Sequence, residues 1–298
     1  MAPTNKNSIC MRLLGGLGNQ LFQFSAGYAL SKEKGVPLVL DASSYASDEL
    51  RKLEITNFSL PEDIKICRTI NPAISKKIKP WHLSYWRQNQ SRMLPYKEKR
   101  HCFDPSISSI NQTAYLKGYF QSPLYFDGYR NDLRDIFKLK STISASSQNY
   151  LDAISAAATS VSVHIRRGDF LSKAETHSSH GVLDRSYYDQ ALDLLRKLYG
   201  RDVQLFFFTD DPDWIEEAFS DIQNAQAVRG NGDHPWEDLY LMAQCDHNII
   251  ANSTFSWWGA WLNDNEEKTV IAPRHWFSRD KHCQTPTFDM FPDGWITL

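Results

Sequence analysis

The sequence lacks any run of apolar residues long enough to cross a membrane. A membrane-spanning helix needs about 20 consecutive, mostly apolar residues, and no segment of this 298-residue chain approaches that length. The first residues, MAPTNKNSIC, also lack the basic stretch followed by an apolar stretch that is typical of a secretory signal. We therefore expect a cytoplasmic protein without an integral membrane anchor, at most peripheral to the membrane.

Cysteine is scarce, and neither sign of charge is in excess. The cysteines are Cys10, Cys67, Cys102, Cys245 and Cys283. Their scattered positions match neither a metal site nor a disulfide framework, so we expect reduced thiols. The 33 Lys and Arg against 35 Asp and Glu give a formal net charge of −2, which argues against a general nucleic-acid binder.

Apolar runs alternate with amphipathic stretches through most of the chain, and this alternation predicts an α/β fold. In the first half, the expected strands cover residues 9–14, 37–41 and 114–119. A helix follows the GGLGN turn and ends near Gly35. Residues 55–105 show no clear periodicity, and we assign no elements there.

The second half has a sharper pattern. The expected strands cover residues 161–165, 203–209, 248–251 and 269–272. The expected helices cover residues 187–199 and 213–219, and a third begins at Pro235, since proline favours the first turn of a helix. A serine-rich stretch at 141–147 separates the halves, so we place the domain boundary within ten residues of residue 150, giving domains 1–150 and 151–298.

Polar residues follow three of the second-half strands at the points where they end. These residues are His164, Arg166, Arg167 and Asp169, then Thr209, Asp210 and Asp211, then Asn252, Ser253, Thr254 and Ser256. In an open parallel sheet, ligands bind outside the carboxyl ends of the strands. We therefore expect the three clusters to form one site.

The chemistry of these clusters suits a guanine nucleotide diphosphate. Arg166 and Arg167 offer permanently charged donors for phosphate, and the start of a helix at residues 253–256 offers backbone N–H groups. Asp238, near the start of another helix, could accept two parallel hydrogen bonds from guanine. Two alternatives stay open: the arginines could form a solvated pair or an interdomain ion pair, and Asp238 could simply complement its helix dipole.

Four segments together resemble the α-1,2-fucosyltransferase family. They are Gly15-Gly-Leu-Gly-Asn-Gln-Leu-Phe-Gln23, Val163-His-Ile-Arg-Arg-Gly-Asp169, Phe208-Thr-Asp-Asp-Pro212 and Asn252-Ser-Thr-Phe-Ser-Trp-Trp258. The His-x-Arg-Arg-x-Asp core is also similar to that of the α-1,6- and protein O-fucosyltransferases. The resemblance implies two Rossmann-like domains facing a cleft (glycosyltransferase B type). It also implies inverting transfer of L-fucose from GDP-fucose to the 2-hydroxyl of a terminal galactoside.

The resemblance assigns the donor to the C-terminal domain and the acceptor to the N-terminal domain. The donor-binding residues that it implies are His164, Arg166, Asp210, Asp238, Ser253, Thr254, Phe255, Ser256, Gly16, Gly18 and Asn19. Among these, Arg166 would face the β-phosphate, while His164 and Asp238 would hold guanine. Residues 253–256 would hold the diphosphate, and the glycine turn, which by itself is a tight strand-to-helix turn, would approach the donor from across the cleft.

Two residues are expected to be catalytic. Arg166 would stabilise the negative charge that develops on GDP, and Asp169 is the first candidate for the base that takes the acceptor proton. Asp169 could instead hold the arginines in place, and Glu175 and His177 are alternative bases.

We expect neither a metal nor a cofactor, since GDP-fucose is a substrate. Asp211-Pro212-Asp213 resembles an Asp-x-Asp metal clamp, but the same residues make a good helix start, and the arginines already supply positive charge.

The partners that we expect are GDP-fucose and a galactose-terminated oligosaccharide, with no nucleic acid. Trp81, Tyr85 and Trp86 are candidate acceptor contacts, while the helical spacing of Trp257, Trp258 and Trp261 favours core packing. The alternative functions are transfer of fucose or another GDP-deoxysugar with a different linkage or acceptor, or a non-catalytic nucleotide- or glycan-binding protein.

Overall fold

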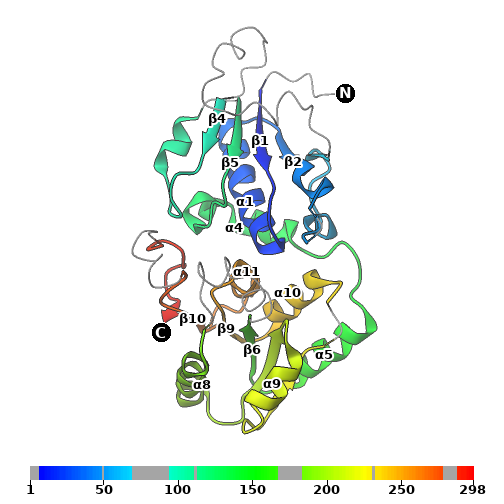
Figure 1. The fold of residues 1–298 in the computed structure, drawn as a ribbon, viewed down its shortest axis with the longest axis vertical. Helices are drawn as coiled ribbons and strands as arrows, with labels where there is room; N and C mark the ends of the chain where they lie inside the picture. The colour runs from blue at the N-terminus through cyan, green and yellow to red at the C-terminus, as the bar shows by residue number, and fades with distance from the viewer. Residues whose placement is uncertain are drawn as a thin grey trace. The chain divides into compact units, whose positions relative to one another are not determined.

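The computed structural model describes residues 7–48, 50–68, 94–110, 113–166, 183–229, 232–277 and 287–298. The chain divides into two compact units (Figure 1), one made of Met1–Lys140 with Phe288–Phe291 and the other of Ser141–Thr287 with Pro292–Leu298. The division after residue 140 lies at the limit of the ten-residue margin given to the predicted boundary, and the helix α5 (Ala145–Ala156) belongs wholly to the second unit. The roles expected for the two halves stay predictions.

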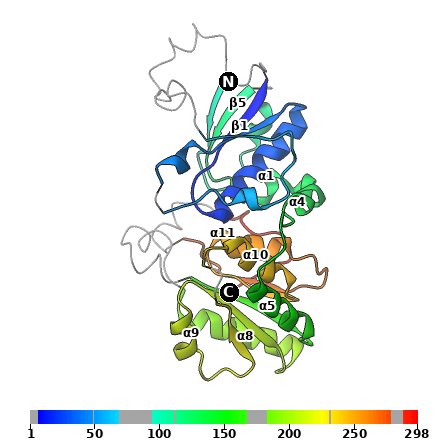
Figure 2. The same cartoon turned by 90° about the vertical axis from the view of Figure 1, so that its right-hand side faces the viewer.

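The first unit is built on a parallel sheet with the strand order β3-β2-β1-β5-β4. The strands are β1 (Ser8–Arg12), β2 (Leu38–Asp41), β3 (Lys65–Cys67), β4 (Leu94–Lys97) and β5 (Thr113–Lys117). The helices are α1 (Leu17–Lys34) and α4 (Arg130–Ile136), with 3-10 turns at Ser43–Ala46, Ile55–Asn57, Pro105–Ser109, Pro123–Tyr125 and Asp127–Tyr129. Figure 2 shows α1 against the strands of this sheet, which it contacts through β1 and β2.

Helix α1 is buried along most of its length rather than on one stripe. Its aromatic residues Phe22 and Phe24 pack against Phe126 and Phe137. The helix ends, as predicted, at Gly35, whose φ of 64° is left-handed and whose N–H donates to the Lys32 carbonyl.

The stretch without clear periodicity contains the two edge strands of this sheet. Both β3 and β4 are short and partly exposed, and β4 contains Pro95, which a strand tolerates at an edge where no partner needs its N–H. Short exposed strands carry no apolar run, which explains why the sequence pattern did not reveal them.

The second unit has a parallel sheet with the order β11-β10-β9-β6-β7-β8. Its strands are β6 (Ser160–Ile165), β7 (Gln204–Thr209), β8 (Ala225–Ala227), β9 (His247–Ile249), β10 (Val270–Ala272) and β11 (Ile296–Thr297). Its other helices are α8 (Arg185–Tyr199), α9 (Pro212–Ala218), α10 (Pro235–Gln244) and α11 (Thr254–Leu262). Two sheets of parallel strands with helices against them confirm the α/β fold class of two Rossmann-like units.

Both faces of this sheet are buried, and successive residues of β7 show it. Leu205 and Phe207 pack in the core that includes α8, while Phe206 and Phe208 pack in the core that includes α5 and α10. A strand covered on both faces reads as a continuous apolar run rather than an alternation, which is why this strand was recognisable in the sequence. No helix in the described part of the chain combines the length and apolar character that crossing a bilayer requires.

Candidate functional site

The sheet order of the second unit places three polar clusters at one edge. Strand β6 lies between β9 and β7, and all three run parallel, with Val163 opposite Ile249 and Ile165 opposite Thr209. Their carboxyl ends therefore open on the same side, where Arg166 follows β6, Asp210 follows β7, and residues 252–254 follow β9.

His164 provides a buried, neutral imidazole at this edge. Its ring centroid lies 5.7 Å from that of Phe255, at the start of α11. Burial, together with the nearby Arg166 charge, lowers the pKa of His164 to about 3, although the Asp210 charge acts in the opposite direction. Among the described residues, no group hydrogen-bonds its buried Nδ1. A buried polar atom normally has a partner, so this nitrogen is suited to a ligand.

Arg166 is held at the start of α11 by Ser253. The Arg166 Nη1 donates to the Ser253 Oγ at 3.3 Å. Ser253 is the N-cap residue of α11, yet its side chain makes no capping hydrogen bond within the described chain. The first N–H groups of a helix lack intrahelical acceptors and carry partial positive charge. A guanidinium beside such a helix start forms a site for an anion.

The other residues of this turn differ in what their side chains can offer. The Ser256 hydroxyl is buried and donates to the carbonyls of Ala251 and Ser253, so it serves the turn itself. Thr254 and Phe255 are only half-buried. Behind them, Trp257, Trp258 and Trp261 are buried and packed on one another, which confirms the prediction that they form core.

Asp211 and Asp213 behave as a helix start. The Asp211 Oδ1 accepts from the Trp214 N–H at 3.3 Å and caps α9, while the Asp213 Oδ1 lies 3.0 Å from Nη1 of Arg229. The helix-start interpretation of this motif is therefore confirmed. Among the described residues, no group of three or more His, Cys, Asp or Glu side chains could hold a metal ion.

Helix α10 carries Asp238 in its first turn and begins at Pro235, as predicted. Glu237, for which the sequence pattern predicted no role, anchors this turn. Its carboxylate accepts from the Ser144 N–H at 3.1 Å, from the Ser144 hydroxyl at 2.6 Å and from the Ser147 hydroxyl at 2.5 Å. Burial raises the pKa of Glu237, but these hydrogen bonds outweigh it and lower the pKa overall. The start of α10 is thus tied to the start of α5.

Helices α10 and α11 approach closely at a glycine. A Cβ on Gly259 would lie 2.8 Å from the Met242 Cβ and 3.0 Å from its Sδ. The close approach helps to position the two helix starts that carry Asp238 and Ser253.

The glycine turn of the first unit follows β1 and begins α1. Gly15 has a φ of +82°, and a Cβ there would lie 2.6 Å from the Asn19 Nδ2, so this position requires glycine. Gly16 is the N-cap of α1, Gly18 is buried in its first turn, and the Asn19 Oδ1 accepts from Gln121 at 2.9 Å. The family resemblance implied roles for Gly16 and Gly18 but none for Gly15.

Two glutamines of the same motif, Gln20 and Gln23, hold this turn. The sequence pattern predicted no role for either of them. The buried Gln20 donates to the carbonyls of Gly15 at 3.2 Å and Lys52 at 2.8 Å, and it accepts from the N–H groups of Glu54 and Ile55. Gln23 accepts from the Leu14 N–H and donates to the Gly118 carbonyl. Gln20 and Gln23 are three positions apart on one helix, and this spacing was the only sign of their role in the sequence.

Several expected site residues lie outside the described residues. They are Arg167, Asp169, Glu175 and His177, which were expected on the donor side, and Trp81, Tyr85 and Trp86, which were expected on the acceptor side.

Comparison with known proteins gives one family. The model of glycosyl transferase family 11 matches residues 2–298. The chain is 31% identical to the O-antigen biosynthesis glycosyltransferase WbnK of Escherichia coli, over 96% of this chain and 99% of that protein. It is 33% identical to an α-1,2-colitosyltransferase of the same organism, over 97% and 98%. It is 26% identical to the galactoside α-(1,2)-fucosyltransferase 2 of Bos taurus, over 89% of this chain and 71% of that protein.

A solved structure supports the fold. A mutant of Arabidopsis thaliana FUT1 in complex with GDP matches with a TM-score of 0.53 at 12% identity, covering 92% of this chain and 72% of that one. This likeness confirms the glycosyltransferase B type of fold.

Proposed function

The chain belongs to glycosyl transferase family 11, and from this premise we propose that it transfers L-fucose from GDP-fucose to the 2-hydroxyl of a terminal galactoside, with inversion. Membership of this family makes the chain a glycosyltransferase. We propose the identity of its donor, the identity of its acceptor and the roles of the individual residues. The observation that carries the proposal is the contact between Arg166 and Ser253 at the start of α11, beside the neutral His164. This arrangement suits a nucleotide diphosphate.

The proposed role of Arg166 follows from the charges of the reaction. Breaking the bond between fucose and phosphate leaves positive charge on the sugar and negative charge on GDP. The guanidinium and the first N–H groups of α11 are already oriented, so they stabilise the departing diphosphate without reorganising. Such a preorganised donor is worth about 3 kcal/mol, or more than about 10²-fold in rate.

Guanine recognition is assigned to His164 and Asp238. A neutral imidazole offers one donor and one acceptor, and a carboxylate can accept two parallel hydrogen bonds from the N1 and N2 groups of guanine. The Nδ1 of His164, which is buried and without a partner in the described chain, is the atom assigned to the donor. Asp210 and residues 253–256 complete the proposed donor site of the second unit. Donor-binding roles are also proposed for Gly16, Gly18 and Asn19.

Deprotonation of the acceptor is assigned to Asp169. An inverting displacement needs a base on the acceptor side, and a carboxylate shortly after the β6 arginine is well placed in the sequence for that task. No metal is included in the proposed mechanism, because Arg166 supplies the positive charge that a metal would bring to the diphosphate.

The two units divide the substrates in this proposal. The second unit binds GDP-fucose, and the first unit binds a galactose-terminated oligosaccharide. The relative WbnK is named for O-antigen biosynthesis, which supports a bacterial surface polysaccharide as the product.

A second donor has a specific observation in its favour. One relative, 33% identical to this chain, is named as a colitosyltransferase with the same α-1,2 linkage. Colitose lacks the 3-hydroxyl of fucose, so the two donors share the nucleotide and differ at one ring position. Transfer of colitose from GDP-colitose is therefore the alternative function.

The test is turnover of the purified protein with lactose and each donor, with EDTA present. We expect GDP release and a fucosylated product whose linkage analysis shows fucose on the 2-hydroxyl of galactose. Faster transfer from GDP-colitose would favour the alternative. Binding of GDP without any transfer would leave a nucleotide-binding protein, and a requirement for Mn²⁺ would contradict the metal-free mechanism.

A further inference from the structure

The strand order of the first sheet marks the place where this unit is expected to bind a ligand. The chain adds strands outward from β1 to β2 and β3, then continues at the opposite edge with β4 and returns inward to β5, which pairs with β1. The direction of strand addition therefore changes between β1 and β5. In open parallel sheets, ligands bind outside the carboxyl ends of the strands at such a point. The GGLGN turn (Gly15–Asn19) follows β1, and residues 118–122, which we call the β5 turn, follow β5.

The β5 turn is held in an uncommon conformation by Glu98, which follows β4. The Glu98 Oε2 accepts from the Tyr119 N–H at 2.7 Å, and its Oε1 accepts from the Phe120 N–H at 3.0 Å. Phe120 has a φ of 54°, which bulky residues rarely adopt. A Cβ on Gly118 would lie 2.4 Å from the Glu98 Cβ, so this position requires glycine. The turn is therefore preorganised by its own hydrogen bonds.

Gln121 joins the β5 turn to the GGLGN turn and keeps one of its polar atoms available. Its side chain is buried, with 7% exposed, and its Nε2 donates to the Asn19 Oδ1 at 2.9 Å, which fixes the plane of the amide. The Oε1 of Gln121 has no hydrogen-bond partner in the described part of the chain. The fully buried side-chain atoms without a partner do not include this oxygen, so it stays accessible to a small group. Buried amide oxygens normally accept a hydrogen bond, so this oxygen is suited to a ligand.

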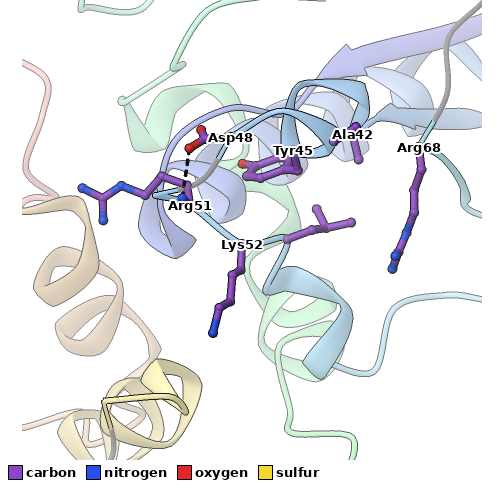
Figure 3. A pocket seen from close by; sticks show the side chains of 8 residues that line it. Ala42, Tyr45, Asp48, Arg51, Lys52 and Arg68 are labelled. Atoms are coloured by element: carbon purple, nitrogen blue, oxygen red, sulfur yellow. Dashed lines mark hydrogen bonds between the residues drawn. The ribbon is translucent and has the colours of Figure 1, made fainter.

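There is open space beside the GGLGN turn. A cavity of about 320 Å³ is lined by Ala42, which follows β2, and by Tyr45 and other residues up to Arg68 (Figure 3). The Tyr45 hydroxyl donates to the Gly15 carbonyl at 2.8 Å, so the cavity borders the turn that also carries Asn19. Ligand cavities measure roughly 300–1,000 Å³, so this edge of the sheet has room for a sugar ring.

The chemistry of the available atom selects the kind of group that it binds. A carboxamide oxygen is neutral and accepts hydrogen bonds, so it pairs with a hydroxyl and not with the oxygens of a diphosphate. We propose that the Gln121 Oε1 accepts a hydrogen bond from a hydroxyl of the acceptor galactose other than the reacting 2-hydroxyl. The inference rests on the proposed function, since it names a residue of the first unit that recognises the proposed acceptor.

The first experiment uses the unmodified protein and four acceptors. These are methyl β-D-galactoside and its 3-deoxy, 4-deoxy and 6-deoxy derivatives, with GDP-fucose as the donor. We expect one deoxy derivative to have a kcat/KM about tenfold below that of the parent galactoside, because its missing hydroxyl leaves the Gln121 oxygen without a partner. Equal kcat/KM values for all four acceptors would overturn the inference.

The second experiment assigns this discrimination to Gln121. Gln121→Leu and Gln121→Met each remove the oxygen at similar volume, and either variant that folds by circular dichroism should bring the kcat/KM ratio of parent to deoxy acceptor close to one. A purely structural role would lower kcat/KM for all four acceptors equally and preserve the ratio. Gln148→Leu is the matched control, since the exposed Gln148 bonds only Asp152 on its own helix, and it should leave the ratio unchanged.

The remaining outcomes separate this inference from the alternatives. If the variants raise KM for GDP-fucose about tenfold and preserve the acceptor ratio, the oxygen binds the donor sugar and the inference is wrong, while fucosyl transfer stands. If GDP binds but no acceptor receives fucose, the proposed function fails and the inference fails with it.

Discussion

At the residue scale, two buried polar side chains show how hydrogen bonding separates support from function. Gln20 has both donors and its acceptor oxygen engaged by backbone groups, so it has no capacity left for a ligand. His164 is equally buried, yet its Nδ1 has no hydrogen-bond partner among the described residues. The first side chain holds a turn in shape; the second is suited to an incoming group.

Removing the Arg166 guanidinium tests the main electrostatic contribution. We expect Arg166→Ala to lower kcat by about 10²-fold or more, because the departing diphosphate loses a preorganised cation. Arg229→Ala is the matched control, since Arg229 pairs with exposed Asp213 and Glu216 and should stay within about twofold. Steady-state kinetics measures both, and an Arg166→Ala enzyme that retains nearly full kcat would remove this residue from the mechanism.

At the element scale, the proposed donor site depends on how closely two helices pack. Helix α11 presents Ser253 and helix α10 presents Asp238, and the two helices approach at Gly259 and Met242. Glu237 then fixes the start of α10 through Ser144 and Ser147. The elements therefore set the spacing between the residues proposed for diphosphate and for guanine.

Gly259→Ala tests this spacing. The new Cβ would lie 2.8 Å from the Met242 Cβ, so the helices must move apart, at a cost of about 1–3 kcal/mol in the free energy of unfolding. We also expect weaker GDP binding, because Asp238 and Ser253 shift relative to each other. Gly128→Ala is the control, since a Cβ there meets nothing within 4 Å. Urea unfolding and calorimetry measure both effects; equal behaviour of the two variants would show that the helix contact is not tight.

At the scale of the whole molecule, the buried imidazole links stability to pH. The pKa of His164 is near 3 in the folded chain and near its ordinary value of 6.5 when unfolded. Below pH 6.5 the unfolded chain takes up a proton that the folded chain does not, so acid favours unfolding. The stabilising contribution is present above pH 6.5 and is lost as the pH falls toward 3.

The corresponding measurement is urea unfolding at pH 7 and pH 5. We expect this one group to reduce the free energy of unfolding by about 2 kcal/mol between these two values. His164→Gln should lose correspondingly less over the same interval, while every other titrating group contributes equally to both proteins. Identical pH dependence in the two proteins would mean that folding does not lower the pKa of His164, so that its imidazole takes up a proton in the folded state as well.

The sequence by itself determined the fold class and which polar residues follow the strands of the second unit, while the roles of these residues in binding a donor stay a prediction. The apolar run of β7, the glycine that ends α1 and the polar residues after three strands depend on neighbours a few positions away, so they could be recognised from local patterns. The same locality explains the confirmed helix start at Asp211 and the confirmed tryptophan core. The short, exposed edge strands β3 and β4 carry no such pattern.

Only the tertiary structure decided which side chains support the fold and which are suited to a ligand. Ser253 and Ser256 read alike in the sequence, but the first meets an arginine 87 residues away and the second bonds its own turn. Gln20 and Glu237 depend in the same way on contacts between distant segments. Hydrogen bonds and steric contacts act over a few ångströms of space regardless of separation along the chain, so packing alone determines these roles.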